Sequence, residues 1–264
     1  MSAVPESIVV PRPDNLRRNL IILTVAGLII GSAWFAGFDI GRIIMNFRKG
    51  GRLLGRMFLD PDWSYAPRIV DPLMETIKMS IVGTFWGALL GLPVAVFAAN
   101  NFIRNPWIAQ PLRFILNITR TIPAMVMASL FVAVFGIGAF SGVVALVIFT
   151  FGLISKLTFE SIEAIDYGQV EALLAVGANK PTILRFAIMP QILPQFFSYT
   201  LYGFEINVRA AAVLGYVGAG GIGQIFEQNL AWRNFDRVGV IIIISFFVVL
   251  VIDLVSSAVR KRLV

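Results

Sequence analysis

Apolar residues gather in long blocks along this chain, and Pro, Gly or charged residues separate one block from the next. A helix needs about 20 mainly apolar residues to cross a bilayer. The alternating pattern of a membrane β-barrel is absent from the sequence, so each block is expected to satisfy its backbone hydrogen bonds as a helix. We therefore predict an all-α, polytopic membrane protein with six transmembrane helices, which run over Leu20–Phe38, Ile77–Ala99, Ile122–Phe135, Ser141–Leu153, Ile192–Val217 and Val238–Val259.

The first span follows three basic residues, Arg12, Arg17 and Arg18. A basic start followed by an apolar run is also typical of a secretory signal peptide. We favour an uncleaved anchor, because the apolar run is long and Trp34 and Phe35 crowd the position where cleavage would occur.

Glycine indicates how some spans pack. Gly83, Gly87 and Gly91 recur at four-residue intervals in the second span. Small residues at this spacing share a helix face and let a neighbouring helix approach closely. Further along, the run Gly136 to Gly138 predicts a tight turn, so we expect the third and fourth spans to form a helical hairpin.

Composition excludes several classes of function. Of all residues, 58% are hydrophobic and 14% are charged, as in an integral membrane protein. The chain has no Cys and no His, which excludes disulfides, thiolate or imidazole ligands and histidine general bases. The sequence shows no acid cluster and no nucleophile paired with a base, so we expect no enzyme activity, no metal and no cofactor. The net charge of +7 comes from Lys and Arg scattered at the ends of apolar blocks, which argues against nucleic-acid binding.

The distribution of Lys and Arg predicts the orientation. These residues are slightly more numerous in the connections on the side of the termini, so we place both termini in the cytoplasm. Basic residues that oppose this rule fall in Asp39–Leu59, where they alternate with Ile, Phe, Leu and Met. We interpret that segment as an amphipathic helix on the membrane surface, with a solvated loop as the alternative. The chain then divides into residues 1–76, with the tail, first transmembrane helix and amphipathic connection, and residues 77–264, the transmembrane domain.

The connection Lys156–Pro190 is long and polar, and in this orientation it is cytoplasmic. Its pattern predicts one helical half over residues 159–176 and a second that starts near Pro181, with Gly177 at the change of direction. Its small residues favour a helix of little bulk, to whose backbone a partner can approach closely: Ala172, Ala175 and Ala178. We therefore predict a short knob that docks another protein.

This connection resembles the cytoplasmic coupling motif of ABC importer permeases, in which Glu-Ala-Ala is followed by Gly and, after a fixed gap, by Ile-x-Leu-Pro. Here Glu171-Ala172 precedes Gly177, and Ile188-Met189-Pro190 follows with the family's Gly-to-Pro spacing. Leu173 replaces the second Ala, Met189 replaces Leu, and Ile188 is displaced by one residue. The resemblance implies contact with a separate ATPase at Glu171, Ala172, Leu173, Ala175, Gly177, Ala178, Asn179, Lys180 and Pro190.

Further motifs between Asp60 and Arg260 resemble the phosphonate-type branch of these permeases: Asp60-Pro61-Asp62-Trp63-Ser64, Arg120-Thr121-Ile122-Pro123, Phe204 to Arg209 and Gly218 to Gly223. The resemblance implies the type I ABC importer permease fold and a permease subunit, in the inner membrane of a bacterial cell, for phosphonate or a related phosphorus oxyanion. The residues that it implies for the translocation path or its gate are Arg120, Thr121, Pro123, Glu205, Asn207, Arg209, Gly218, Gly220, Gly221 and Gly223. Another small solute such as methionine, or an ATP-independent carrier, remains the alternative.

The resemblance also implies the partners. A second permease copy would pair with the first around a central path, two ABC ATPase subunits would receive the coupling helices, and an extracytoplasmic solute-binding protein would deliver the solute. ATP and Mg would bind to the ATPases, which would swing the coupling helices and turn an inward-open path outward. This chain has no Gly-x-x-x-x-Gly-Lys-[Ser/Thr] phosphate loop of its own.

Three charged positions have open interpretations. Glu205 lies four residues before Arg209, the favourable order for an intrahelical ion pair. We interpret them as such a pair, with a role in the path as the alternative. Arg120, at the edge of the third span, is expected either to attract an anion or to extend to the lipid headgroups.

The glycine-rich run after the fifth span contains a literal dinucleotide fingerprint, Gly-x-Gly-x-x-Gly, at Gly218, Gly220 and Gly223. It follows an apolar helix and not a strand, so we do not expect nucleotide binding there. We predict a flexible, close-packed turn at the outer end of the span, as part of a gate or in contact with the binding protein.

Overall fold

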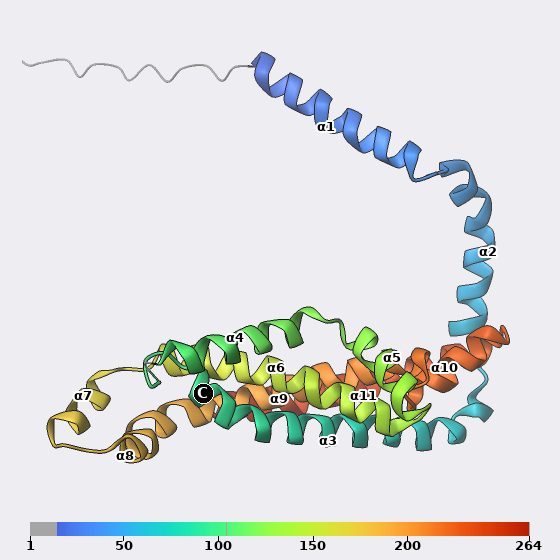
Figure 1. The fold of residues 1–264 in the computed structure, drawn as a ribbon. Helices are drawn as coiled ribbons and strands as arrows, with labels where there is room; N and C mark the ends of the chain where they lie inside the picture. The colour runs from blue at the N-terminus through green and yellow to red at the C-terminus, as the bar shows by residue number, and fades with distance from the viewer. Residues whose placement is uncertain (1–14, 104, 264) are drawn as a thin grey trace, which may run out of the picture. The chain divides into compact units, whose positions relative to one another are not determined.

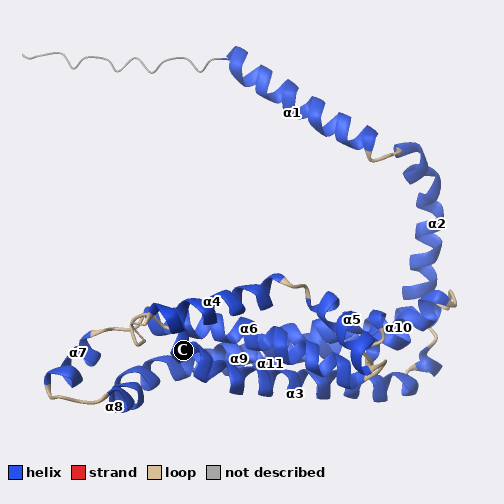
Figure 2. Ribbon diagram, viewed as in Figure 1, coloured by secondary structure: helices blue, strands red, loops and turns tan. Residues whose placement is uncertain are grey.

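A computed structural model describes residues 15–103 and 105–263, and every regular element within these ranges is a helix (Figure 2). The chain divides into two units, Met1–Leu54 and Gly55–Val264. Arg12, one of the basic residues before the first predicted span, lies outside the described residues. The all-α prediction is therefore confirmed for the part of the chain that the structure describes.

The first unit consists of α1 (Asn15–Phe35) and most of α2 (Ile40–Phe58). α1 is apolar and has no buried residue, as expected for the first span, although it ends at Phe35 and not at Phe38. α2 confirms the helix predicted over Asp39–Leu59, so the alternative of a loop is wrong.

The second unit contains a bundle of four long helices, α3 (Pro67–Ala98), α6 (Ala139–Glu163), α9 (Met189–Leu214) and α11 (Phe235–Leu263) (Figure 1). Among the described residues α1, α3, α6 and α11 are long and apolar enough to cross a membrane. A fifth span is possible if α4 (Pro106–Thr121) and α5 (Ala124–Phe135) cross together as a bent pair. α9 overlaps the predicted span Ile192–Val217, although it ends at Leu214, and it packs against α3, α6 and α11.

α5 matches the third predicted span, Ile122–Phe135, within two residues, but the sequence analysis missed the helix before it and misplaced the start of the second span. α4 lies outside the predicted spans and begins at Pro106, where Asn105 caps it by accepting the Trp107 N–H at 3.0 Å. It ends before Pro123, because a residue that precedes proline is forced into extended backbone, and the chain bends by 91° into α5. α3 begins at Pro67, ten positions before the expected Ile77, because proline is well tolerated in the first turn of a helix.

The predicted helix over residues 159–176 is also broken. α6 continues to Glu163, and a new helix, α7 (Gly168–Ala175), starts after a loop. Within that loop the Asp166 carboxylate accepts the Gly168 N–H at 3.0 Å. Aspartate offers the backbone this local alternative to a helix, and the sequence pattern of small and acidic residues does not reveal it.

Glycine sets the close contact between α3 and α6. An added Cβ on Gly83 would lie 2.6 Å from Leu146 Cβ, and one on Gly87 would lie 2.6 Å from Thr150 Cβ. The close helix approach expected from the glycine spacing is therefore confirmed. The turn between α5 and α6 is confirmed as well, since Gly136 has φ +90° and Gly138 has φ +142°.

Short elements close the two ends of the second unit. α7 and α8 (Lys180–Ile183) project at one end of the bundle, and α10 (Ile222–Ala231) lies at the other (Figure 1). Before α3, a 3-10 turn (Trp63–Tyr65) is tied to α11 by Asp62, which lies 3.2 Å from Arg237 Nε. The Ser64 hydroxyl, and then Arg237, hold the pKa of the Asp62 carboxyl below its usual value.

Candidate functional site

The α7–α8 hairpin is fixed in shape by its backbone. Gly177 has φ +78°, its N–H donates to the Leu174 carbonyl at 3.0 Å, and the Ala178 N–H donates to the Leu173 carbonyl at 2.9 Å. These two bonds form a Schellman motif, which ends a helix with glycine in the left-handed region. The change of direction predicted at Gly177 is confirmed.

The second arm of the hairpin starts with a side-chain cap. Asn179 Oδ1 accepts the Thr182 N–H at 3.0 Å, so Lys180 and Pro181 form the first turn of α8, as the sequence predicts. A π-helical turn (Leu184–Ile188) leads from α8 into α9, and Pro190 occupies the first turn of α9.

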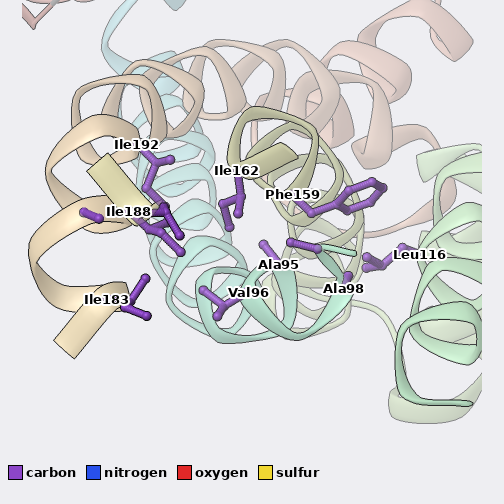
Figure 3. Close-up of a cluster of buried hydrophobic side chains, with 12 residues drawn as sticks. Ala95, Val96, Ala98, Leu116, Phe159, Ile162, Ile183, Ile188 and Ile192 are labelled. Atoms are coloured by element: carbon purple, nitrogen blue, oxygen red, sulfur yellow. The ribbon is translucent and has the colours of Figure 1, made fainter. Parts of the chain in front are cut away.

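One face of the hairpin is packed on the bundle. Ile183 and Ile188 are buried with residues of α3 and α6 in one apolar cluster (Figure 3). Val170 belongs to the same cluster, and Leu173 and Ala178 pack against it. Leu173 and Ala178, which were predicted to contact an ATPase, therefore pack inward and hold the hairpin on the bundle.

The other face of the hairpin is exposed. Glu171, Ala172, Ala175 and Gly177 lie on it, as predicted for a docking knob. So do two apolar side chains that the sequence reasoning missed, Leu174 at 49% and Val176 at 77% exposure. Exposed apolar side chains of this kind become visible only when the direction of each side chain is known.

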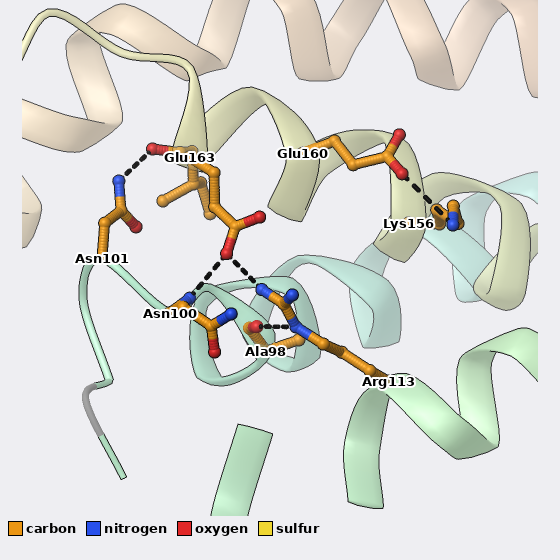
Figure 4. A network of polar contacts seen from close by, with 8 residues as sticks. Ala98, Asn100, Asn101, Arg113, Lys156, Glu160 and Glu163 are labelled. Carbon is orange, nitrogen blue, oxygen red and sulfur yellow. Dashed lines mark hydrogen bonds and ion pairs between the residues drawn. The ribbon is translucent and has the colours of Figure 1, made fainter. Parts of the chain in front are cut away.

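A polar network lies beside the hairpin, at the ends of α3 and α6 (Figure 4). Glu163 accepts the Asn100 N–H at 2.8 Å and pairs with Arg113 of α4. Arg113 Nε donates to the Ala98 carbonyl at 2.8 Å, and Asn101 Nδ2 donates to the Ile162 carbonyl. The network satisfies backbone groups at two helix ends and joins α3, α4 and α6.

Glu205 of α9 is buried and pairs with Arg260 of α11, whose Nη1 lies 2.7 Å from Glu205 Oε1. The intrahelical pair predicted between Glu205 and Arg209 is therefore wrong. The reason is tertiary packing: α11 brings a second guanidinium to Glu205, and a cation on a neighbouring helix cannot be seen from the spacing within α9.

Asn207 is completely buried and joins three helices. Its Nδ2 donates to the Thr84 hydroxyl at 2.8 Å and to the Thr150 hydroxyl at 2.6 Å. Its Oδ1 has no hydrogen-bond partner within the described part of the chain. In this conformation Asn207 holds α3, α6 and α9 together, and its predicted place in a path stays a prediction.

Three other predicted path residues lie together at the bend between α4 and α5. Arg120, Thr121 and Pro123 are exposed there. α4 approaches α6 so closely that a Cβ on Gly152 would lie 2.5 Å from Thr119 Oγ1, and Arg120 Cγ would be in ordinary contact with it at 3.4 Å. Arg209 is exposed on α9, and within residues 15–103 and 105–263 it forms no ion pair.

The glycine-rich run is tightly packed. Gly218, Gly220 and Gly221 have φ near +80°, and the Ile222 N–H donates to the Thr76 hydroxyl of α3 at 2.8 Å. A Cβ on Gly223 would lie only 1.9 Å from the Ala212 carbonyl oxygen. The close-packed turn predicted here is confirmed, and its glycines are required by close contacts with α3, α6 and α9.

Comparison with known proteins places this geometry in context. The model of the family described as "Binding-protein-dependent transport system inner membrane component" matches residues 91–264. The phosphite transport system permease protein PtxC of Stutzerimonas stutzeri is 34% identical over 91% of this chain and 88% of its own. The phosphate-import permease protein PhnE of Mycolicibacterium smegmatis is 36% identical over 72% of this chain and 36% of its own. A solved chain of the MetNI methionine ABC transporter in an inward-facing conformation has the same fold, with a TM-score of 0.68 and 24% identity over 77% of this chain and 99% of that one.

Proposed function

Because this chain belongs to the family of binding-protein-dependent transport system inner membrane components, we propose that it is the permease subunit of an ATP-driven importer for a phosphorus oxyanion. The chain supplies the translocation path and carries out no chemistry on the solute. A separate ATPase binds ATP and Mg and drives transport. The single observation that carries this proposal is the exposed face of α7. This helix contains Glu171 and Ala172 of the coupling motif, and backbone hydrogen bonds fix its end at Gly177.

The docking face of α7 fits a groove on a soluble partner. It consists of Glu171, Ala172, Leu174, Ala175 and Val176. Its apolar members lose water when they dock, and its alanines let the partner approach the helix backbone. An ATP-independent carrier has no use for such a projecting face, so the face favours the ATP-driven alternative.

Two observations support a phosphorus oxyanion as the solute: the names of the relatives and one side chain of α9. Proteins named as phosphite and phosphate permeases are 34% and 36% identical to this chain over 91% and 72% of its length. The substrate test is a titration of the system's solute-binding protein with a phosphonate, phosphate, phosphite and methionine. Tight binding of one or more of the three phosphorus compounds is expected, and tight binding of methionine alone would contradict the substrate class.

Arg209 is the side chain of α9 that we assign to the path. It is exposed in a single chain, and its nearest carboxylate along the helix, Glu205, is already paired with Arg260. An uncompensated cation in a membrane helix faces a protein interior or a water-filled cavity, and here it would attract the anion.

Arg209→Ala is expected to reduce uptake at least tenfold, because each 1.4 kcal/mol of lost attraction weakens binding by about a factor of ten. Assembly with the ATPase should remain intact. Uptake and co-purification measured on the same preparation separate these effects. Arg209→Lys, which keeps the charge, should retain more activity, and normal uptake by Arg209→Ala would contradict the assignment.

We place α2 on the outer surface of the membrane. Its Arg42, Lys49 and Arg56 lie on one face, and exposed Phe47 and Leu54 lie on the opposite one. The helix follows the apolar α1 after a short turn at Gly37, which keeps it near the bilayer.

The absence of Cys allows a clean test of the position of α2 with a single introduced label. A fluorophore on Phe47→Cys should be quenched by quenchers in the lipid chains, whereas one on Lys49→Cys should not. The two positions point about 200° apart around the helix. Equal quenching at both positions would show that α2 does not lie on the bilayer.

Assembly and orientation complete the proposal. Two identical copies form the path between them, two ATPase subunits bind in the cytoplasm, and a solute-binding protein docks on the outer side. Both termini lie in the cytoplasm of a bacterial cell, and residues 77–264 form the transmembrane domain. The positive charges on the side of the termini and the position of α7 support this arrangement.

A further inference from the structure

The base of the α7–α8 hairpin is held by one side chain that lies outside the coupling motif. Gln191 stands in the first turn of α9. Its Oε1 accepts the Asp166 N–H at 3.1 Å, and its Nε2 lies 3.3 Å from the Asp166 carbonyl oxygen. The same Nε2 donates to the Ala187 carbonyl at 2.8 Å and lies 3.3 Å from Gln169 Oε1. The two amide hydrogens are thus shared among three acceptors, and the bond to Ala187 is the shortest.

These contacts join the two chain passages that connect the hairpin to the bundle. One passage is the loop from α6 into α7, which contains Asp166. The other is the π-helical turn from α8 into α9, which contains Ala187. Gln191 takes up both backbone groups of Asp166 and a carbonyl of the π-helical turn, so it closes the hairpin at its base.

The π-helical turn itself is a second observation that points to a functional role for this position. In a π-helical turn the backbone hydrogen bonds are offset by one residue, and such turns are frequent at functional sites. Here the turn lies between the docking face of α7 and the helix that carries Glu205, Asn207 and Arg209. Apolar packing alone would let the loop and the turn slide past each other, whereas directional hydrogen bonds fix their relative position.

We propose that Gln191 is a positioning residue that makes the hairpin move as one body with the ends of α6 and α9. When the ATPase displaces α7, the Gln191 amide passes that displacement to α9 and so to the path. This inference rests on the proposed function, since it assigns to one residue the link between ATP hydrolysis and transport.

The test compares Gln191→Ala with Gln195→Ala. Gln195 is exposed one turn further along α9 and makes no side-chain hydrogen bond to the described residues. Each variant is reconstituted in liposomes with the ATPase and binding protein of its system, and solute uptake is divided by ATP hydrolysed. Gln191→Ala removes at least two hydrogen bonds and should lower this ratio by at least about fivefold, the change expected from the loss of a single net hydrogen bond. Gln195→Ala should leave the ratio unchanged.

A purely structural role would reduce uptake and hydrolysis together and leave their ratio constant, and that result would overturn the proposal. Gln191→Glu adds a second check, because it keeps the acceptor for the Asp166 N–H but cannot donate to the Ala187 carbonyl. It should also lower the ratio, and a wild-type ratio would contradict the role of the Ala187 bond.

Hydrogen exchange on the isolated chain separates this inference from the proposed function. Gln191→Ala should speed exchange of the Asp166 amide in detergent, with or without an ATPase. Unchanged exchange would show that Gln191 does not hold the base of the hairpin. If the wild-type chain shows no ATP-driven uptake, the proposed function fails, and no link to transport can then be assigned to Gln191.

Discussion

Gly177→Asp is expected to abolish ATP-driven uptake in a variant that still folds and inserts into the membrane. Apart from its two chain neighbours, no described residue has an atom within 4 Å of the position where its Cβ would be, so the substitution meets no steric obstacle there. The left-handed backbone at φ +78° costs about 1–2 kcal/mol for a residue with a side chain, and aspartate tolerates it better than most. The fold therefore survives.

The defect arises at the contact with the ATPase. A carboxylate at the tip of α7 would be buried without a partner when the ATPase approaches, and the cost of several kcal/mol exceeds what the small docking face contributes. Binding of the ATPase to the purified variant should fall at least tenfold. Glu171→Lys should weaken the same contact through the first turn of α7.

Gly37→Asp is the matched control. Gly37 also has a positive φ, +67°, and no described atom within 4 Å of its added Cβ apart from its two chain neighbours, but in the sequence it lies between α1 and α2, outside the coupling motif. The ATPase should bind this variant as it binds the wild-type chain. If the ATPase binds the wild-type chain, Gly177→Asp and Gly37→Asp equally well, α7 has no part in the coupling mechanism.

Gly223→Ala is expected to produce the largest loss of stability. The new Cβ would lie 1.9 Å from the Ala212 carbonyl oxygen and 2.9 Å from Gly215 Cα, and both are backbone atoms that cannot turn aside. Overpacking of this kind costs about 1–3 kcal/mol and occasionally more. The thermal midpoint of the purified chain should fall by about 2–4 °C for each kcal/mol.

Gly203→Ala provides the comparison within the same bundle. Its Cβ would lie 3.4 Å from Ile154 Cδ1, an ordinary contact, and alanine stabilises a helix by about 1 kcal/mol relative to glycine. This variant should match or exceed the wild-type midpoint. A Gly223→Ala variant as stable as Gly203→Ala would show that the glycine-rich run is loosely packed.

Patterns that repeat along one element were readable from the sequence. The spacing of Gly83 and Gly87 predicted the contact of α3 with α6, and Gly177 predicted the end of α7, because a helix face and a helix cap are local properties. The apolar blocks predicted the long helices for the same reason. The coupling motif predicted an exposed knob, and the exposed Glu171 and Ala172 agree with it.

Features that depend on two elements were not readable. Glu205 pairs with Arg260, which is 55 positions away in the sequence and reaches it only because α11 packs on α9. Asn207 is buried where α9 meets α3 and α6, and its side chain donates hydrogen bonds to a hydroxyl on each of those two helices. The exposure of Val176, on which its proposed docking role rests, depends on which way its side chain points after α7 is capped, and hydropathy alone would assign it to a core.

The most direct test of the central claim is uptake of radiolabelled phosphite or phosphate into liposomes that contain the chain and its ATPase, with the binding protein outside and ATP inside. Uptake should require ATP and both partners, and it should be lost with Gly177→Asp. Uptake by the chain alone, without ATPase or ATP, would contradict the account.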